Sequence, residues 1–275
     1  MIYIKKIQYY FVKYLWSKIG ANYKVNYKEK GILNFIDIGS FGGLPEPWLS
    51  NANKVKYLVN FEPNDKIKET KNITTFNTAV WSKEEEKDFY IYKGFRGTGS
   101  SLFQQNYNYV KDNFLELSKK GSQKLANSWF KRSQVLKTQK IQCNTLDNLI
   151  LNKFSDKNFD FIKIDAQGAE LDILKGGDRI LNNCIGLHLE LFTIPLYKDI
   201  PLLPEVESYL SEKGFKLIKK MGPHGTFHSQ NDCIFLKLDA DPMKLTLIKN
   251  IYQINFYREH GFCLFPGHVF LSGRF

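Results

Sequence analysis

Two carboxylates on either side of a glycine are the residues of this sequence best suited to chemistry. Asp165 and Glu170 lie in the segment DAQGAE, directly after the apolar run 159–164. Such a run is typical of a central strand that is covered on both faces. Gly168 permits a tight turn into a helix that opens at 169–171. The segment therefore predicts two carboxylates at the carboxyl edge of a sheet, where open α/β sheets bind their ligands.

A second glycine turn follows the predicted strand 31–38, in the pattern D-x-G-x-x-x-G. Its members are Asp37, Gly39, Ser40 and Gly43. Glycine directly after a strand lets the backbone approach a ligand closely. The spacing differs from the G-x-G-x-x-G of dinucleotide-binding proteins, which argues against a nicotinamide-dependent oxidoreductase.

An acidic residue ends the next predicted strand, 56–61. Glu62 stands 23 residues after Gly39, and Pro63 follows it. An acidic residue about 20 residues beyond a glycine turn is placed to accept hydrogen bonds from ribose hydroxyls. The alternative is a surface glutamate beside a turn, but the spacing to the first glycine turn favours a ligand-binding role.

Three histidines and a glutamate are further candidates for the same edge. His188 and Glu190 fall on one face near the end of the predicted strand 184–191. His224 and His228 lie in the short link between the last two predicted strands. A histidine can serve as a general base, but a lone strand histidine such as His188 also fits a hydrogen-bonded core residue.

The elements that must position these residues are predicted from apolar periodicity and capping residues. The link between the last two strands is too short for a parallel crossover, so this pair must be antiparallel. Gly176 and Gly177 are expected to close the helix after Glu170 in the left-handed conformation. The expected strands span 31–38, 56–61, 73–80, 159–164, 184–191, 215–219 and 232–238, and the expected helices span 145–152 (with Thr145 as N-cap), 203–213 and a stretch near 242–260.

An irregular insertion over 94–136 is framed by two alternating segments, 89–92 and 138–143, that predict an antiparallel pair. We expect a mobile flap, with Ser100 and Ser101, and a helix that lie over the site. The basic residues of the insertion can either meet a phosphate group or form a solvated helix face.

Composition limits the partners and the compartment. The formal net charge of +11 favours anionic partners, but the lysines are spread along the chain, which favours a solvated basic surface over a nucleic-acid stripe. Four cysteines lie far apart, so no zinc-binding pair is expected, and buried free thiols fit a reducing compartment. We therefore expect a cytoplasmic protein without a metal site.

The two ends of the chain are predicted to extend the main domain, 31–239. Residues 1–30 form an N-terminal helical extension without the features of a signal peptide. Its amphipathic part, 1–18, either packs on the domain or makes a peripheral contact with the inner membrane face. The aromatic-rich tail, 240–275, is expected to pack on the domain or on a second copy in a homodimer.

In chain order, these motifs resemble the FkbM family of S-adenosylmethionine-dependent methyltransferases. The resemblance covers about 31–238 and implies the class I methyltransferase fold, a Rossmann-like, doubly wound α/β sheet of seven strands with the last strand antiparallel. It rests on the segments FIDIGSFGG (35–43), VNFEP (59–63), NTAVW (77–81), GTGSSLF (97–103), NTLDNLI (144–150), DFIKIDAQGAELDILKGG (160–177), LHLELF (187–192) and DCIFLK (232–237).

The resemblance also implies roles for individual residues. The glycine turn would bind the methionine part of S-adenosylmethionine through Asp37, Gly39, Ser40 and Gly43. Glu62, followed by Pro63, would bind the ribose, Ala79 and Val80 would approach the adenine, and Asp165 and Glu170 would face the reaction chamber. The chain departs from the family pattern at Gln167, where a glutamate is usual, and at Ser40-Phe41, where smaller polar residues are usual.

The function implied is O-methylation of a sugar or polyol hydroxyl, in a nucleotide-linked sugar or a bacterial surface polysaccharide. Asp165 is the first candidate for the general base, or else it binds the ammonium group of the cofactor. Glu190, His188, His224 and His228 are the reserve candidates. A nucleic-acid methyltransferase and a non-catalytic cofactor-binding scaffold are the alternatives, but clustered arginines and base-stacking aromatics are absent from the sequence near the predicted site.

Overall fold

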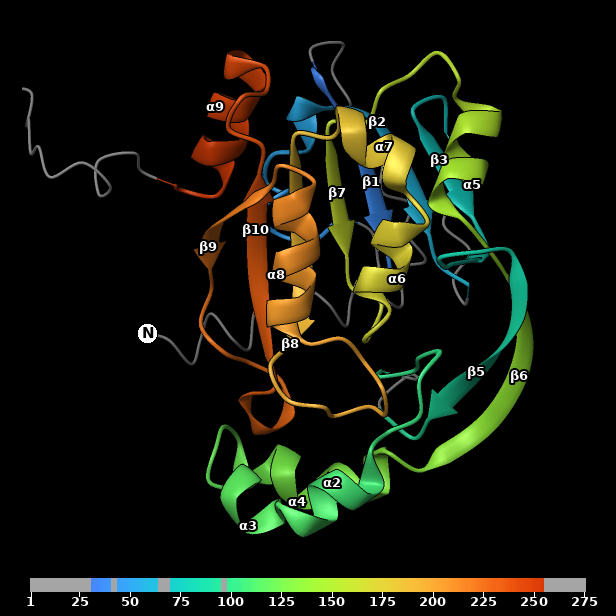
Figure 1. Ribbon diagram of the computed structural model, residues 1–275, viewed down its shortest axis with the longest axis vertical. Coiled ribbons are helices and arrows are strands. Elements are labelled where there is room, and N and C mark those ends of the chain that lie inside the picture. The colour runs from blue at the N-terminus through green and yellow to red at the C-terminus, as the bar shows by residue number, and fades with distance from the viewer. Residues whose placement is uncertain (1–30, 41–43, 64–69, 95–97, 255–275) are drawn as a thin grey trace, which may run out of the picture.

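A seven-stranded mixed sheet forms the centre of the molecule (Figure 1). The computed structural model describes residues 31–40, 44–63, 70–94 and 98–254. The first five strands in sheet order are parallel, and the last two form an antiparallel hairpin. This confirms the predicted class I methyltransferase topology. The order is β3 (Ile73–Phe76), β2 (Val55–Phe61), β1 (Leu33–Ile38), β7 (Phe161–Ile164), β8 (Gly186–Phe192), β10 (Gln230–Leu236) and β9 (Lys216–Lys220).

A second, three-stranded sheet corrects the prediction of one strand over 73–80. The segment is divided between β3 of the large sheet and β4 (Ala79–Val80), which pairs with β6 (Val135–Asn144). The side chains between the two strands fix the break: Asn77 Nδ2 donates to the Glu62 carbonyl and Thr78 Oγ1 to the Gln142 carbonyl. β6 also pairs with β5 (Glu85–Tyr92), the antiparallel pair predicted around the insertion.

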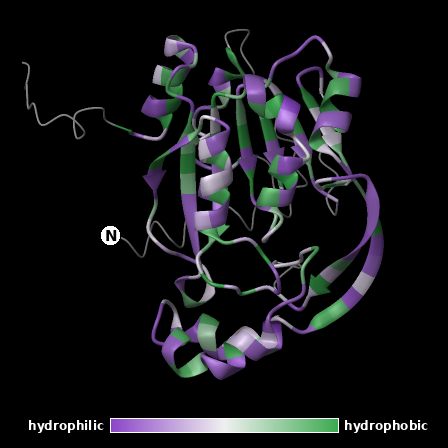
Figure 2. Cartoon of the chain, viewed as in Figure 1, coloured by the Kyte–Doolittle hydropathy of each residue, from purple (hydrophilic) through white to green (hydrophobic). Residues whose placement is uncertain are grey.

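Two layers of helices bury the faces of the large sheet. Their apolar sides, together with the green central strands of Figure 2, make up the two main cores. Thr145 caps α5 as predicted, because its Oγ1 accepts a hydrogen bond of 3.1 Å from Asn148 N. One face is covered by α5 (Leu146–Lys153), α6 (Glu170–Lys175), α7 (Asp178–Asn183) and α8 (Leu203–Glu212), and the other by η1 (Ala52–Lys54), the preceding turn with Trp48, and α9 (Pro242–Ile251).

The expected left-handed ending of α6 at Gly176 and Gly177 is wrong. Gly176 has a φ of −77° and Gly177 a φ of −118°. A Cβ at Gly176 would stand 2.1 Å from the Trp81 carbonyl oxygen. Glycine is therefore needed there for the close approach of β4's end to the helix, and not for the turn.

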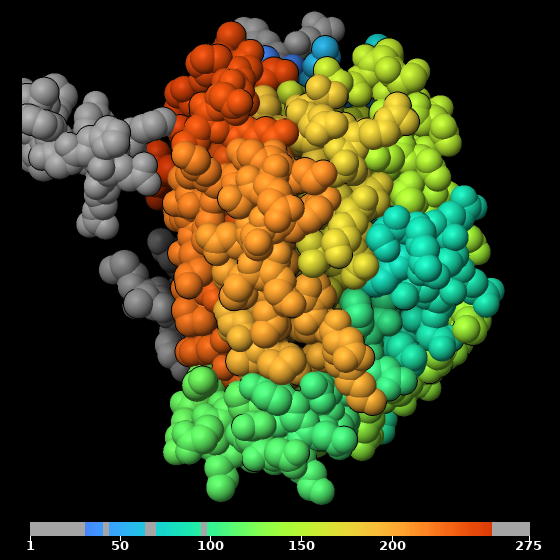
Figure 3. Space-filling model, viewed as in Figure 1, coloured from blue at the N-terminus to red at the C-terminus, as the bar shows by residue number. Residues whose placement is uncertain are grey.

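The insertion between β5 and β6 forms a small helical lobe with its own core. Val110, Trp129 and Phe227 are at most 2% exposed and pack together in it. Figure 3 shows the lobe in green at one end of the molecule, next to the orange segment that includes α8. It contains α2 (Tyr107–Asp112), α3 (Phe114–Leu117) and α4 (Gln123–Arg132), and it contacts η3 (Thr226–His228). Within the described ranges, none of the helices has the length and hydropathy needed to cross a membrane.

Candidate active site

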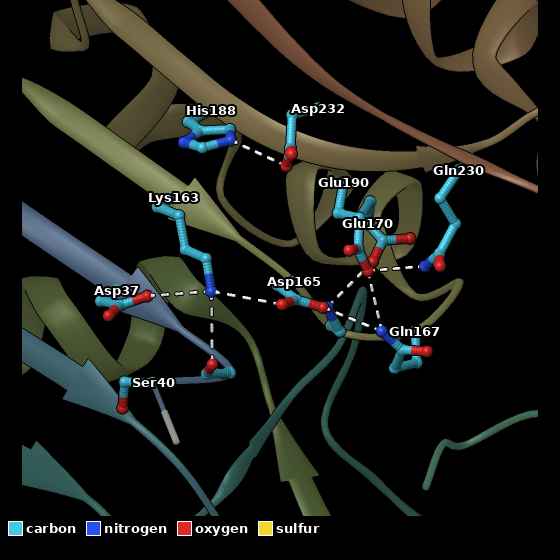
Figure 4. Close-up of polar contacts among 12 residues, drawn as sticks. Asp37, Ser40, Lys163, Asp165, Gln167, Glu170, His188, Glu190, Gln230 and Asp232 are labelled. Carbon is cyan, nitrogen blue, oxygen red and sulfur yellow. Dashed lines mark hydrogen bonds and ion pairs between the residues drawn. The ribbon is translucent and has the colours of Figure 1, made fainter. Parts of the chain in front are cut away.

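Four carboxylates meet at one edge of the large sheet (Figure 4). Asp37 lies near the end of β1, Asp165 follows β7, Glu190 lies near the end of β8, and Asp232 lies near the start of β10. Because β10 runs antiparallel to β8, its beginning reaches the edge where the parallel strands end. The register places Asp232 directly opposite Glu190. The topology thus gathers side chains that are far apart in the sequence.

Asp37 is fully buried and lies beside Lys163. Its Oδ1 is 3.5 Å from Lys163 Nζ, yet neither carboxylate oxygen has a hydrogen-bond partner among the described residues. Burial raises the pKa of Asp37, although the Lys163 ammonium opposes this shift. A buried carboxylate with unused acceptor positions is a ready partner for a cationic ligand group.

Lys163 is a site residue that the sequence analysis missed. Its Nζ donates to the Gly39 carbonyl at 3.3 Å and lies 3.6 Å from Asp165 Oδ2. Burial opposes the charge, but the carboxylates of Asp37 and Asp165 more than compensate and raise the pKa of Lys163. The signal was available: a lysine inside the otherwise apolar strand FIKI must find a charged partner.

The glycine turn after β1 brings the backbone against the turn after β7. Gly39 has a φ of +75°, and a Cβ there would stand 2.0 Å from the Asp165 carbonyl oxygen. Only glycine satisfies both conditions. Ser40 is 1% exposed, and its Oγ is 3.4 Å from the Phe61 carbonyl oxygen. Gly43 lies outside the described residues.

The predicted ribose and adenine positions lie along the neighbouring strand ends. Glu62 is 8% exposed and directly follows β2, with Pro63 next to it in a turn. Ala79 and Val80 are buried in β4. The Asn77 side chain connects the two groups, because it donates to the Glu62 carbonyl at 3.2 Å.

Gln167 bridges the carboxylates of Asp165 and Glu190. It has a φ of +53°, and its Nε2 lies 2.9 Å from both Asp165 Oδ1 and Glu190 Oε2. Gln230 Nε2 donates to the same Glu190 oxygen. Burial, with the charges of Asp165 and Asp232, raises the pKa of Glu190 well above its ordinary value. Desolvation acts in the same direction on Asp165, but the ion pair with Lys163 holds the pKa of Asp165 below its ordinary value.

Glu170 braces the turn between β7 and α6. Its side chain is 2% exposed, and its carboxylate accepts hydrogen bonds from Ala166 N at 2.9 Å and from Gly168 N at 3.0 Å. Burial raises the pKa of Glu170 to about 7. These contacts give Glu170 a part in shaping the turn that carries Asp165 and Gln167.

Two histidines flank Asp232. His188 Nε2 is 3.0 Å from Asp232 Oδ1, and His224 Nε2 is 3.3 Å from Asp232 Oδ2. The nearby Asp232 carboxylate raises the pKa of His224, whereas the two histidines lower the pKa of Asp232 against the effect of its burial. An ionised Asp232 can only accept hydrogen bonds, so we assign a proton to Nε2 of both histidines, although the 3.3 Å contact of His224 Nε2 lacks the geometry of a hydrogen bond. His224 Nδ1 then carries a lone pair and faces Glu190 Oε1 at 3.7 Å.

A buried hydrogen-bonded chain holds His188 from behind. Trp48 Nε1 donates to the Tyr252 hydroxyl at 2.7 Å, and that hydroxyl lies 3.0 Å from His188 Nδ1. With the assigned tautomer, Tyr252 donates to Nδ1. His188 is 7% exposed and therefore acts inside the protein, where it links Asp232 to α9.

Of the two flap serines, Ser101 contacts the turn that carries Gln167, and Ser100 contacts β5. Ser101 Oγ donates to the Gln167 carbonyl at 2.7 Å, and Ser100 Oγ accepts from Tyr92 N at 3.4 Å. His228 is exposed in η3, and its ring lies against Gly121 of the helical lobe. None of the polar contacts found among the described residues joins His228 to the carboxylates.

Three residues of this site are also of the types that bind metal ions. One ligand atom each from Glu190, His224 and Asp232 lie within 4.8 Å of one another. Imidazole and carboxylate groups in this arrangement suit a divalent cation or a proton relay. The expectation that no metal is bound stays a prediction.

The residues present fit S-adenosylmethionine. The paired acceptors of Asp37 suit the ammonium group, and Gly39, which is half-buried, follows the same strand. The acidic side chain of Glu62 follows the neighbouring strand at the position expected for ribose hydroxyls.

Solved structures with similar folds are distant in sequence. The methyltransferase FkbM of Methylobacillus flagellatus KT is 14% identical with a TM-score of 0.42, and the match covers 74% of this chain but 43% of that one. Sp1610 of Streptococcus pneumoniae, a candidate tRNA (m1A22) methyltransferase, is 13% identical with a TM-score of 0.35 and coverages of 82% and 73%. TrmK of M. capricolum, solved with S-adenosyl-homocysteine, is 11% identical with a TM-score of 0.34 and coverages of 78% and 68%.

Sequence comparison identifies the family. No curated protein has a sequence that matches this chain. The pattern of the Methyltransferase FkbM domain matches residues 19–217. This region holds the glycine turn, Glu62 and the turn after β7, and it ends inside β9, before His224 and Asp232. Because the match covers well over half of the sequence, the chain belongs to the FkbM family of S-adenosylmethionine-dependent methyltransferases.

Proposed function

We propose that this protein transfers a methyl group from S-adenosylmethionine to a hydroxyl group of a sugar or polyol. The observation that carries the proposal is the imidazole of His224, held by Asp232 at 3.3 Å beside Glu190. A hydroxyl acceptor must lose its proton during transfer, so its enzyme needs a base within hydrogen-bond reach. Transfer to an already nucleophilic amine has no such requirement.

The cofactor side would be formed by the ends of β1, β2 and β7. Asp37 would accept hydrogen bonds from the ammonium group and Glu62 from the ribose. When bound, S-adenosylmethionine supplies a methyl group that its sulfonium centre has already activated. Lys163 fixes the carboxylates of Asp37 and Asp165 relative to each other before the cofactor arrives. Such preorganisation spares the enzyme the cost of ordering these groups during the reaction.

We assign the proton transfer to His224, on the side of the site where the acceptor would bind. Its Nδ1 would take the proton of the hydroxyl, and Asp232 would stabilise the imidazolium that forms. Asp165, the first candidate from the sequence, is a weaker base because the ion pair with Lys163 lowers its pKa. Glu190 and Gln167, which share a hydrogen bond of 2.9 Å, would orient the acceptor.

Methyl transfer from labelled S-adenosylmethionine tests this function. The acceptors would be sugar nucleotides, neutral oligosaccharides and capsular polysaccharide fragments, with unmodified tRNA as the competing class. Alkali-stable label on a carbohydrate, lost in the His224→Gln variant, supports O-methylation with His224 as base. Label on tRNA alone would favour a nucleic-acid methyltransferase, and cofactor binding without transfer to any acceptor would favour the scaffold alternative.

A further inference from the structure

A pocket lies next to the segment that follows the flap serines. It has a volume of about 590 Å³ and opens between the end of β5, the start of α2 and the start of β6. This volume is within the range of small-molecule sites. The residues used below are Tyr92, Gln104, Gln105, Tyr107, Gln134 and Lys198.

The lining matches the chemistry of sugar hydroxyls. Four side-chain amides and two tyrosines face the pocket, with one lysine and, among the described lining residues, no acidic group. Amides and phenols both donate and accept hydrogen bonds, as sugar hydroxyls do. Tyr107 is 37% exposed, and its aromatic ring could stack on a pyranose. A single cation among amides favours a largely neutral glycan over a nucleic-acid backbone.

Two of the four amides are already held in place by lysines. Lys198 Nζ donates to Gln104 Oε1 at 3.0 Å, and Lys93 Nζ donates to Gln134 Oε1 at 2.7 Å. Gln105 differs, because its Oε1 is buried and receives no hydrogen bond from the part of the chain that the structure describes. A hydroxyl donor in the pocket would supply the missing partner.

The flap joins this pocket to the turn that carries Gln167. Gln105 N donates to the Tyr92 hydroxyl at 2.8 Å, and the Tyr197 hydroxyl lies 2.7 Å from the Gly99 carbonyl oxygen and 3.1 Å from Gln167 Oε1. Tyr92 and Tyr197 are each 1% exposed and form a wall between the two sites. One sugar unit therefore cannot fill both sites at once.

We propose that this pocket binds a sugar unit of the acceptor glycan other than the unit that is methylated. The inference rests on the proposed function and specifies its substrate as an oligosaccharide or polysaccharide rather than a single sugar. Binding of the remote unit would position the flap, and through it Gln167, at the reacting hydroxyl. Contacts remote from the reacting atoms can support catalysis in this way.

The test measures binding and transfer separately, on one array of mono- to hexasaccharides from bacterial polysaccharides that also carries an RNA oligonucleotide. The full chain is compared with Gln105→Leu and with Gln134→Ala, an exposed position where misfolding is not expected. Asn250→Ala, exposed on α9, is the matched control. Folding is checked by the affinity for S-adenosylhomocysteine, which should be equal in all four proteins.

The proposal predicts binding that begins at disaccharides or longer and weakens at least tenfold in both pocket variants. It also predicts a KM for the longer acceptors that rises by the same factor. Binding without methyl transfer would contradict the proposed function and leave the pocket supported. The proposal for the pocket would be overturned if monosaccharides and longer glycans were methylated with equal KM values that do not change in the variants. It would also be overturned if the protein bound only RNA, or bound no glycan.

Discussion

Replacing Asp232 by asparagine should disable the base without disturbing the cofactor. Asp232 accepts from His188 Nε2 through one oxygen and faces His224 Nε2 with the other. Asparagine has only one oxygen. The Tyr252 hydroxyl already donates to His188 Nδ1, so His188 Nε2 keeps its proton. It therefore continues to donate to the single oxygen of the new amide.

The amide nitrogen must then face His224 Nε2 and donate to it. His224 carries its proton on Nδ1 instead, and the atom assigned as the base no longer has a lone pair. General-base catalysis is worth about 10²–10⁴-fold, so kcat should fall by a factor in that range, or about 3–5 kcal/mol in the activation barrier. Asp239→Asn, on an exposed turn, is the matched control and should leave kcat unchanged.

The assay is the pH dependence of kcat/KM, measured beside the affinity for S-adenosylhomocysteine. The Asp232 carboxylate raises the pKa of His224, so the wild-type rate should increase with pH through a pKa above that of an ordinary histidine. The residual activity of Asp232→Asn should have its acid limb at lower pH. A wild-type rate and profile would refute the assignment, and so would a parallel loss of S-adenosylhomocysteine affinity, which would indicate structural damage instead.

Three further predictions concern the cofactor, the turn and the metal question. Glu62→Ala should weaken S-adenosylhomocysteine binding by about 1–3 kcal/mol in calorimetry, while the exposed Glu212→Ala should not; equal affinities would remove Glu62 from the site. Burial raises the pKa of Glu170 from 4.5 to about 7, so between these pH values the folded protein holds a proton on Glu170 that the unfolded chain has lost. The contribution of Glu170 to the free energy of unfolding should therefore decrease by about 3 kcal/mol as the pH rises through this range. Denaturant titrations should find that decrease absent in Glu170→Gln, and an identical pH dependence in both proteins would contradict it. Activity should survive a strong chelator; a loss that one divalent cation restores would make Glu190, His224 and Asp232 ligands.

The sequence predicted most of the large sheet because its central strands are continuous apolar runs that follow local rules. It missed the division of 73–80, because β3 and β4 find different partners and only long-range pairing separates them. The prediction for the glycines after α6 was wrong for a related reason. Glycine is needed at 176 because the Trp81 carbonyl, which is remote in sequence, leaves no space for a Cβ.

The sequence predicted only those residues of the candidate site that belong to a local motif at the end of a strand. Asp37, Gly39, Glu62 and Asp165 lie near or just after the carboxyl end of a strand, and topology alone brings such positions together. Neither Asp232 nor its contacts could be derived, since they depend on the register between β10 and β8 and on the link that returns His224 to that strand. Lys163 was overlooked because its apolar neighbours dominate the pattern of the strand.

The central claim, that the carboxyl edge beside Gly39 is an S-adenosylmethionine pocket, is tested most directly by calorimetric titration of the full chain with S-adenosylhomocysteine and, in parallel, with NADH. The account predicts micromolar binding of S-adenosylhomocysteine, weakened by Glu62→Ala, and no binding of NADH. Binding of NADH, or no binding of S-adenosylhomocysteine in the presence and absence of acceptor glycans, would contradict it.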